Sequence, residues 1–210
     1  MMRRKHLLII LLIISASISS EARLPDGRFF RRVNMGLEWS YTQSLLRTWN
    51  YNLLSEEGYR IFDKDAAFMF HPNANVSAQI GFLLNDHFVI ALHGGYAGIG
   101  KDNRLIPVQL RLTWFPEPVD EDGGFFYLQG GPAFHLRPQE MRQAWLFVSG
   151  MGYRLRLNAE CNLDFSLGLK YLYDHPLLPD PEGPGYVPAQ NIRKNNAGSF
   201  ALDLSMGFNC

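Results

Sequence analysis

The chain has 210 residues and a formal net charge of zero, with 20 lysine and arginine residues against 20 aspartate and glutamate residues. No basic tract stands out from this balance, which disfavours nucleic acid as a partner. Hydrophobic residues make up 47% of the chain, an ordinary share that does not separate a soluble protein from a membrane barrel.

Residues 1–22 have the three parts of a secretory signal peptide. Basic residues 3–5 precede an aliphatic run over residues 7–14, and small residues follow up to Ala22. The run is too short to cross a bilayer as a helix, which takes about 20 residues. We expect cleavage after Ala22 and a short periplasmic segment over residues 23–32. The leader removes three basic residues and one acidic residue, so the mature chain would carry a net charge of −2.

Eight later segments alternate between apolar residues and polar or small ones with a period of two. This is the period of a β-strand, whose side chains point to opposite faces in turn. In IPVQLRLTWF (residues 106–115) every even position is apolar, whereas the odd positions include Gln109, Arg111 and Thr113. The eight predicted strands cover residues 33–42, 75–84, 87–97, 106–115, 126–136, 145–157, 162–173 and 200–209.

The connections between the predicted strands differ in length. Three of them are short turns, and two, over residues 43–74 and 174–198, are long. The first could also hold strand extensions around a turn at residues 55–58, because Tyr59, Ile61 and Phe68 look strand-like. The second long connection contains five prolines, which rule out regular strand pairing over most of it. Short turns at one rim and long loops at the other, with both chain ends on the short side, are typical of an outer-membrane β-barrel.

The charged residues of the strands fall on the face opposite the large apolar residues. An eight-stranded barrel has an interior just wide enough for side chains to fill, so opposite charges could pair there beside small residues. The apolar rows would then face lipid. The predicted charge network of the lumen comprises Glu38, Arg111, Arg154, Arg156, Asp164, Lys170 and Asp203.

Aromatic residues gather at both ends of the apolar rows. Two belts of amphipathic rings at the borders of an aliphatic band are typical of a membrane interface. A secreted β-sandwich, the alternative for such alternation, explains neither the belts nor the unequal loops. The predicted aromatic girdle comprises Trp39, Tyr41, Tyr96, Trp114, Phe126, Trp145, Tyr153, Tyr171, Tyr173 and Phe208.

Over residues 33–210 the sequence resembles the small eight-stranded, porin-like outer-membrane β-barrel proteins of Gram-negative bacteria. Segments such as IPVQLRLTWF and GGFFYLQGGPAFHL carry the resemblance, which lies in their pattern. It implies an all-β, antiparallel, up-and-down transmembrane barrel with a filled polar lumen, exported to the outer membrane. It also implies contact with outer-membrane lipid, lipopolysaccharide and the barrel-assembly machinery. Members of this group usually end on an aromatic residue, and here Phe208 stands two places short of the end.

The two cysteines, Cys161 and Cys210, stand at the turn-side ends of the last two predicted strands. Their positions have the parity of the outward residues Leu163 and Phe208, so both side chains leave the same face. Neighbouring antiparallel strands bring such residues to the separation that a disulfide needs. The pattern therefore predicts a Cys161–Cys210 bridge in an exported protein. The alternative is two unpaired or intermolecular thiols.

The histidines do not form a recognisable catalytic or metal-binding pattern. His93 and His135 have inward parity, whereas a lipid hydrolase needs a nucleophile and a base together on the lipid-facing surface. His71 and His175 fall in the long connections, too isolated for metal ligands. The sequence therefore predicts no enzyme activity, cofactor or metal.

The predicted role is structural, adhesive or surface-binding, exerted through long extracellular loops over residues 43–74 and 174–198, because loops on a rigid scaffold are where recognition usually resides. These loops would bind a surface ligand or a larger envelope complex. Two alternatives stay open. One is a barrel that transports small solutes, and the other is a membrane-embedded hydrolase that modifies lipid A.

Overall fold

The computed structural model describes residues 33–210 apart from 56–57, 102, 137–142, 179 and 181–184. The predicted signal peptide and the segment over residues 23–32 lie outside this range. Eight strands form a closed barrel in which each strand pairs antiparallel with its neighbour in the chain and β1 closes the ring against β8. The strands are β1 (Val33–Leu54), β2 (Arg60–Asn85), β3 (Phe88–Ile99), β4 (Asn103–Trp114), β5 (Gly123–His135), β6 (Gln143–Arg156), β7 (Asn162–Asp174) and β8 (Ile192–Asn209).

Each of the eight predicted segments falls on one of these strands and extends beyond it by at most one residue, and the predicted fold class is confirmed. A 3₁₀ turn, η3 (Ala189–Asn191), precedes β8. Among the described residues, no helix is long and apolar enough to cross a membrane.

The direction of the two faces follows from side-chain exposure. Leu110, Leu167 and Leu204 point outward with 53%, 52% and 59% of their surface exposed. Arg111 and Lys170 point inward and are 8% and 5% exposed. The barrel is therefore apolar outside and charged inside, which is the reverse of a soluble barrel.

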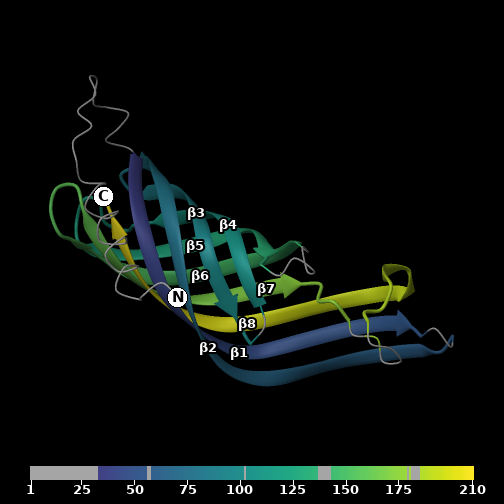
Figure 1. Cartoon of the computed structure of the whole chain (residues 1–210). Coiled ribbons are helices and arrows are strands. Elements are labelled where there is room, and N and C mark those ends of the chain that lie inside the picture. Colours follow the sequence, from purple (N-terminus) through teal and green to yellow (C-terminus); the bar gives the residue numbers. More distant parts are fainter. Residues whose placement is uncertain (1–32, 56–57, 102, 137–142, 179, 181–184) are drawn as a thin grey trace, which may run out of the picture.

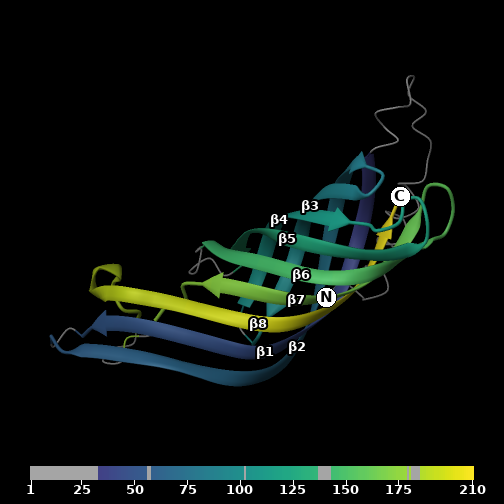
Figure 2. The ribbon, with the colours of Figure 1, turned by 180° about the vertical axis from the view of Figure 1, so that it is seen from behind.

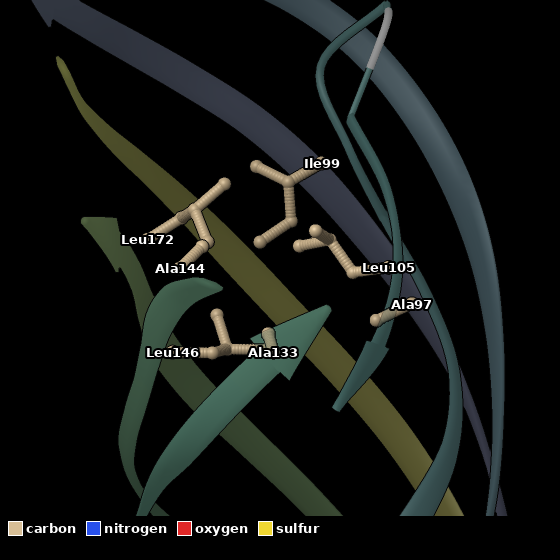
Figure 3. Packing of buried hydrophobic residues seen from close by; sticks show 7 residues of the cluster. All are labelled: Ala97, Ile99, Leu105, Ala133, Ala144, Leu146 and Leu172. Carbon is tan, nitrogen blue, oxygen red and sulfur yellow. The ribbon is translucent and has the colours of Figure 1, made fainter. Parts of the chain in front are cut away.

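The interior is not polar throughout. At the end of the barrel away from the chain termini, seven small or aliphatic side chains pack together inside the ring (Figure 3). Near the opposite end Val89, Phe115, Phe125, Tyr127 and Val148 form a second apolar cluster. The charged residues lie in the layers around and between these clusters. The first cluster comprises Ala97, Ile99, Leu105, Ala133, Ala144, Leu146 and Leu172.

The stretch over residues 43–74 is not a long loop but holds the expected strand extensions around a short turn. β1 continues to Leu54 and β2 begins at Arg60, so residues 55–59 alone connect them. β8 likewise begins at Ile192, inside the second predicted loop. Figures 1 and 2 show β1, β2 and β8 running side by side well past the ends of the other strands. We call this three-stranded extension, residues 46–54, 60–71 and 192–199, the arm.

A shift in register explains why the alternation did not carry the predicted strands into the arm. The pairings of β1 with both β2 and β8 shift between Ser44 and Leu46. This irregularity reverses the parity of β1, so that Leu46 shares the outward face with Phe68 and Phe200. A period-two pattern read straight through the shift loses its phase. The apolar–polar alternation therefore fades at the point where the strand continues.

Candidate functional site

Arg111 and Glu38 form the central ion pair of the interior. Two guanidinium nitrogens of Arg111 donate to the two carboxylate oxygens of Glu38 at 2.6 and 3.0 Å. The third, Nε, donates to Gln129 Oε1 at 2.6 Å, and Gln129 Nε2 donates to Gln109 Oε1 at 2.8 Å. The guanidinium also lies 4.5 Å from the ring centroid of Tyr127. This bidentate pair joins β1 to β4 across the lumen.

Lys170 and Asp203 form a second pair on neighbouring strands. Lys170 Nζ lies 2.7 Å from Asp203 Oδ1 and donates to Thr42 Oγ1 at 3.0 Å. The same carboxylate oxygen accepts hydrogen bonds from the hydroxyls of Ser40 and Thr42. Asn75 Nδ2 donates to Ser40 Oγ at 2.9 Å. Side chains of β1, β2, β7 and β8 thus meet around one carboxylate.

Arg154 and Asp164 form a third pair nearer the short turns. Arg154 Nε and Nη2 each donate to one oxygen of Asp164 at 2.7 Å. Asn209 Nδ2 donates to the same carboxylate at 2.8 Å, and the Phe115 ring lies 4.4 Å from the guanidinium carbon. The three pairs contain equal numbers of positive and negative side chains, which is the condition under which buried charges are tolerated.

Arg156 does not belong to this network, which corrects the prediction for it. Its side chain is exposed at the rim beyond β6. Its guanidinium donates to the backbone carbonyls of Asp120, Asn158 and Ala159, and its backbone N–H donates to Asp122. The parity of Arg156 was read correctly, but the residue stands at the last position of β6. There a long side chain reaches the turns instead of the lumen.

The two inward histidines occupy different surroundings. His93 is 1% exposed, and neither ring nitrogen has a hydrogen-bond partner among the described protein atoms. It borders a cavity of about 30 Å³ together with Arg111 and Asp203, a space that holds only one or two water molecules. His135 Nε2 lies 3.1 Å from Asp174 Oδ1 at the other end of the interior. The structure therefore does not bring the two rings together.

The remaining histidines are dispersed as well. The His175 ring meets the Tyr173 ring edge to face at 5.0 Å, and His71 lies on β2. In the part of the chain that the structure describes, no group of three or more His, Cys, Asp or Glu side chains is arranged to hold a metal ion.

The predicted disulfide is present. Cys161 and Cys210 are bonded, with their Cα atoms 4.2 Å apart, directly beyond the paired residues Asn162 and Asn209 of β7 and β8. Cys210 also exchanges two backbone hydrogen bonds with Met35 of β1, at 2.7 and 2.8 Å. The bridge therefore ties the end of β8 to β7, next to the seam where β1 closes the ring against β8.

The residues of the predicted girdle all lie on the outward face, and several touch one another. Trp114 and Phe126 stack with ring centroids 5.7 Å apart, and Tyr171 contacts Phe200 at 4.7 Å. The sequence pattern missed two outward aromatic residues of β2. Phe68 and Phe70 are 92% and 80% exposed. Phe68 belongs to a row that continues through Leu46 and Phe200 to Tyr171, so the aromatic surface extends onto the arm.

The inner face of the arm carries acidic and aromatic residues. Trp49 Nε1 donates to Asp63 Oδ2 at 2.9 Å. Burial, a hydrogen bond with Asp63 and the charge of that carboxylate together raise the pKa of Tyr51. Beyond them Leu53 packs with Leu178 and Val187 of the connection between β7 and β8. This connection therefore folds against the arm.

The outer face of the arm has the opposite charge. Arg60 and Lys64 of β2 and Lys194 of β8 stand at outward positions of the register, beside the amides of Asn50 and Asn196. Among the described residues, no aspartate or glutamate occupies an outward position of the arm. The arm is thus a sheet with a cationic outer face and a more acidic inner face.

Among the described residues, the β2 edge is the longer of the two edges of the arm that lack a second strand; the other is residues 192–196 of β8. β3 pairs with β2 only from Val76 onward, so among the described residues the stretch 60–75 of β2 has a strand partner on one side alone, β1. A sheet edge of this length presents unpaired backbone N–H and C=O groups to whatever lies beside it.

A closed ring of eight antiparallel strands, charged inside and apolar outside, is the fold of the small eight-stranded outer-membrane β-barrels. No protein-family model and no curated protein sequence matches the chain. Among solved structures, the chain is similar to Neisserial surface protein A, with 10% identity, a TM-score of 0.41, and coverage of 82% of this chain and 95% of that one.

It is also similar to the outer-membrane protease OmpT of Escherichia coli, with 9% identity, a TM-score of 0.41 and coverage of 84% and 96%. A third similar structure is Ail, the attachment invasion locus protein of Yersinia pestis, with 11% identity, a TM-score of 0.30 and coverage of 84% and 99%. At these identities and TM-scores the likeness does not extend to function.

Proposed function

We propose that this chain is an outer-membrane barrel whose role is to bind a protein partner at the cell surface through the arm. The observation that carries the proposal is the free edge of β2, raised beyond the rim on a paired, three-stranded sheet. An extended segment of a partner can add to such an edge as a further strand, with main-chain hydrogen bonds for affinity and side-chain contacts for specificity.

The barrel itself supports an anchoring role. Its apolar outer surface matches a bilayer, whose core must be spanned by a structure with no unpaired strand edges. The free edge of β2 belongs to the arm, on the side that carries the longest connection, the one between β7 and β8. Long connections lie on the extracellular side in outer-membrane barrels. Anchor and binding surface are therefore separate parts of one sheet.

The interior argues against the transport of solutes. Apolar clusters occupy both ends of the lumen, and the cavities beside the ion pairs measure about 30 and 20 Å³. We expect no conductance above background when the protein is inserted into planar bilayers. Steady single-channel currents would favour the porin alternative instead. A changed mass of lipid A in cells that express the protein would favour the hydrolase alternative.

The binding proposal is tested by photocrosslinking on intact cells. A photoreactive residue replaces Ala66 or Ala67, neighbouring positions on the free edge of β2, or Leu84 near the short turns as the control. Adducts with one protein at the arm positions, but not at Leu84, are expected. A variant whose arm is cut back by joining Thr48 to Ala66 through an Asn-Gly turn should retain the barrel and lose the partner. Arm positions that crosslink no protein would contradict the proposal.

A further inference from the structure

Two hollows lie on the outward surface of the molecule, over strands β5–β8 and the arm. Figure 2 shows these strands, with β8 continuing into the arm. We name the hollows with the short turns placed downward. The lower one has a volume of about 540 Å³ and lies over β5, β6, β7 and β8. The upper one has a volume of about 490 Å³ and lies where β7 ends and the arm continues. Tyr171 borders both of them, so the two hollows adjoin at this residue, and we call them together the groove.

The lower hollow arises from small residues at outward positions. Gly130 and Ser149 stand where the neighbouring outward residues are large. Ser149 is paired with Leu128 on one side and Leu169 on the other. The ring of Phe147 leans over Gly130 and occupies the space that a side chain would need there. A Cβ atom on Gly130 would lie 2.9 Å from Phe147 Cδ1. The result is an apolar trough within the lipid-facing surface.

The upper hollow has a more polar lining than the lower one. Its lining includes Asn50, Lys64 and Asn196 from the outer face of the arm, together with Tyr171 and Tyr173. The Tyr171 ring packs over Gly198, where a Cβ atom would lie 3.0 Å from the phenol oxygen. Asp65 also borders this hollow, but its side chain belongs to the inner face of the arm. Amides, aromatic rings and a lysine ammonium group thus stand directly above an apolar trough.

An apolar hollow beside one that carries amides and a lysine fits an amphiphile with a negatively charged headgroup. We propose that the groove binds one molecule of the anionic glycolipid of the outer leaflet, with an acyl chain in the lower hollow and a phosphorylated sugar in the upper one. The inference rests on the membrane location in the proposed function. The ammonium of Lys64 attracts phosphate, with Arg60 and Lys194 on the same face, and the asparagine amides hydrogen-bond sugar hydroxyls. The charges of the arm therefore select a glycolipid over a neutral lipid.

The test measures bound lipid by native mass spectrometry of the full-length mature protein folded in detergent micelles. The probe is purified bis-phosphorylated lipid A, with phosphatidylglycerol and phosphatidylcholine as comparison lipids. We expect one lipid A per barrel, weaker retention of phosphatidylglycerol and none of phosphatidylcholine. Equal retention of the two anionic lipids would overturn the assignment to a glycolipid, and equal retention of all three would overturn the site.

Two variants test the two halves of the groove. Ser149→Leu fills the lower hollow, and its control is Ala78→Leu at another outward position. Lys64→Glu reverses the charge of the upper hollow, and its control is Lys101→Glu, an exposed lysine between β3 and β4. Each groove variant should lower lipid A retention by about tenfold, because Ser149→Leu removes the space for an acyl chain and Lys64→Glu replaces attraction of the phosphate by repulsion. The controls should retain lipid A. Equal losses in a variant and its control would overturn the proposal.

A gel-mobility shift on heating separates this inference from the proposed function. Folded barrels migrate differently until boiled, so the shift reports folding independently of bound lipid. If wild type and variants all show the shift and insert into vesicles, but none retains lipid A, the groove proposal alone fails. If the wild type does not insert into vesicles at all, the membrane assignment fails as well.

Discussion

At the scale of single residues, the interior is stabilised by pairing. Arg111 uses all three guanidinium nitrogens, two toward Glu38 and one toward Gln129. Charges removed from water are costly, and the pair compensates for this only while both members are present. The interior is therefore more sensitive to the loss of one partner than to the loss of both.

Arg111→Met should destabilise the folded protein by about 3–5 kcal/mol, because Glu38 would be left buried without its partner. Adding Glu38→Gln should recover part of that loss. The measurement is urea unfolding of the protein in lipid vesicles, followed by tryptophan fluorescence. Arg193→Met, at an exposed residue of the arm, is the control and should change stability by less than about 0.5 kcal/mol. Equal unfolding midpoints for Arg111→Met and the control would refute this prediction.

In the arm, Tyr51 should titrate at a higher pH than an ordinary tyrosine. Burial comes first among the causes that raise its pKa, followed by the hydrogen bond with Asp63 and the charge of Asp63. A raised pKa in the fold means that the neutral phenol is stabilised. This stabilisation is present below the usual pKa of about 10 and is lost as the pH rises through the raised value.

Asp63→Asn should therefore lower the pKa of Tyr51, although burial would still keep it above the usual value. An ultraviolet difference titration of phenolate formation, between wild type and Asp63→Asn, detects the shift of one tyrosine. Asp65→Asn, two positions along β2, is the matched control. If both variants moved the titration equally, the effect would be one of general charge and not of the contact between Tyr51 and Asp63.

At the scale of elements, the closing seam between β7, β8 and β1 is reinforced at the short-turn rim. The disulfide spans a sequence separation of 49 residues, and Cys210 also bonds to Met35 of β1. A covalent link over such a separation limits the conformations of the unfolded chain. The seam brings together the two ends of the described chain, which have the longest loop to close.

Cys161→Ser combined with Cys210→Ser should lower the free energy of unfolding by about 2–4 kcal/mol, the usual range for such a bridge. Urea unfolding of the vesicle-inserted double variant, compared with the oxidised wild type, provides the measurement. The reduced wild type should match the double variant. A wild type that loses no stability on reduction would show that the bridge adds nothing to the seam.

At the scale of the whole molecule, period-two alternation was sufficient to predict eight strands, their order around the ring and the direction of their faces. It did not define how far the strands extend into the arm, where apolar and polar residues no longer alternate regularly. In the arm, outward positions are occupied by Thr48, Asn50 and Phe62, because this part of the sheet rises beyond the apolar band. The register shift before Leu46 also changes the phase of β1.

The interior shows a second limit of the sequence pattern. Charged inward residues were recognisable by parity, but their partners depend on which strands face each other across the lumen. Glu38 of β1 meets Arg111 of β4, a pairing that no neighbouring strand dictates. The sequence pattern also did not identify Leu146 and Leu172 as inward residues. Where both faces of a strand carry apolar residues, the apolar–polar alternation is interrupted. These contacts form only when the eight strands close into a ring.

The central claim is the direction of the two faces of every strand, and spin labels along β4 test it most directly. Single cysteines at positions 106–114, in a protein whose native cysteines are replaced by serine, would be labelled and inserted into lipid vesicles. Oxygen, which concentrates in lipid, should reach the labels at Val108, Leu110 and Leu112. A water-soluble nickel chelate should reach none of these. Oxygen-accessible labels at Gln109 and Arg111, with Leu110 shielded from both reagents, would contradict the membrane barrel.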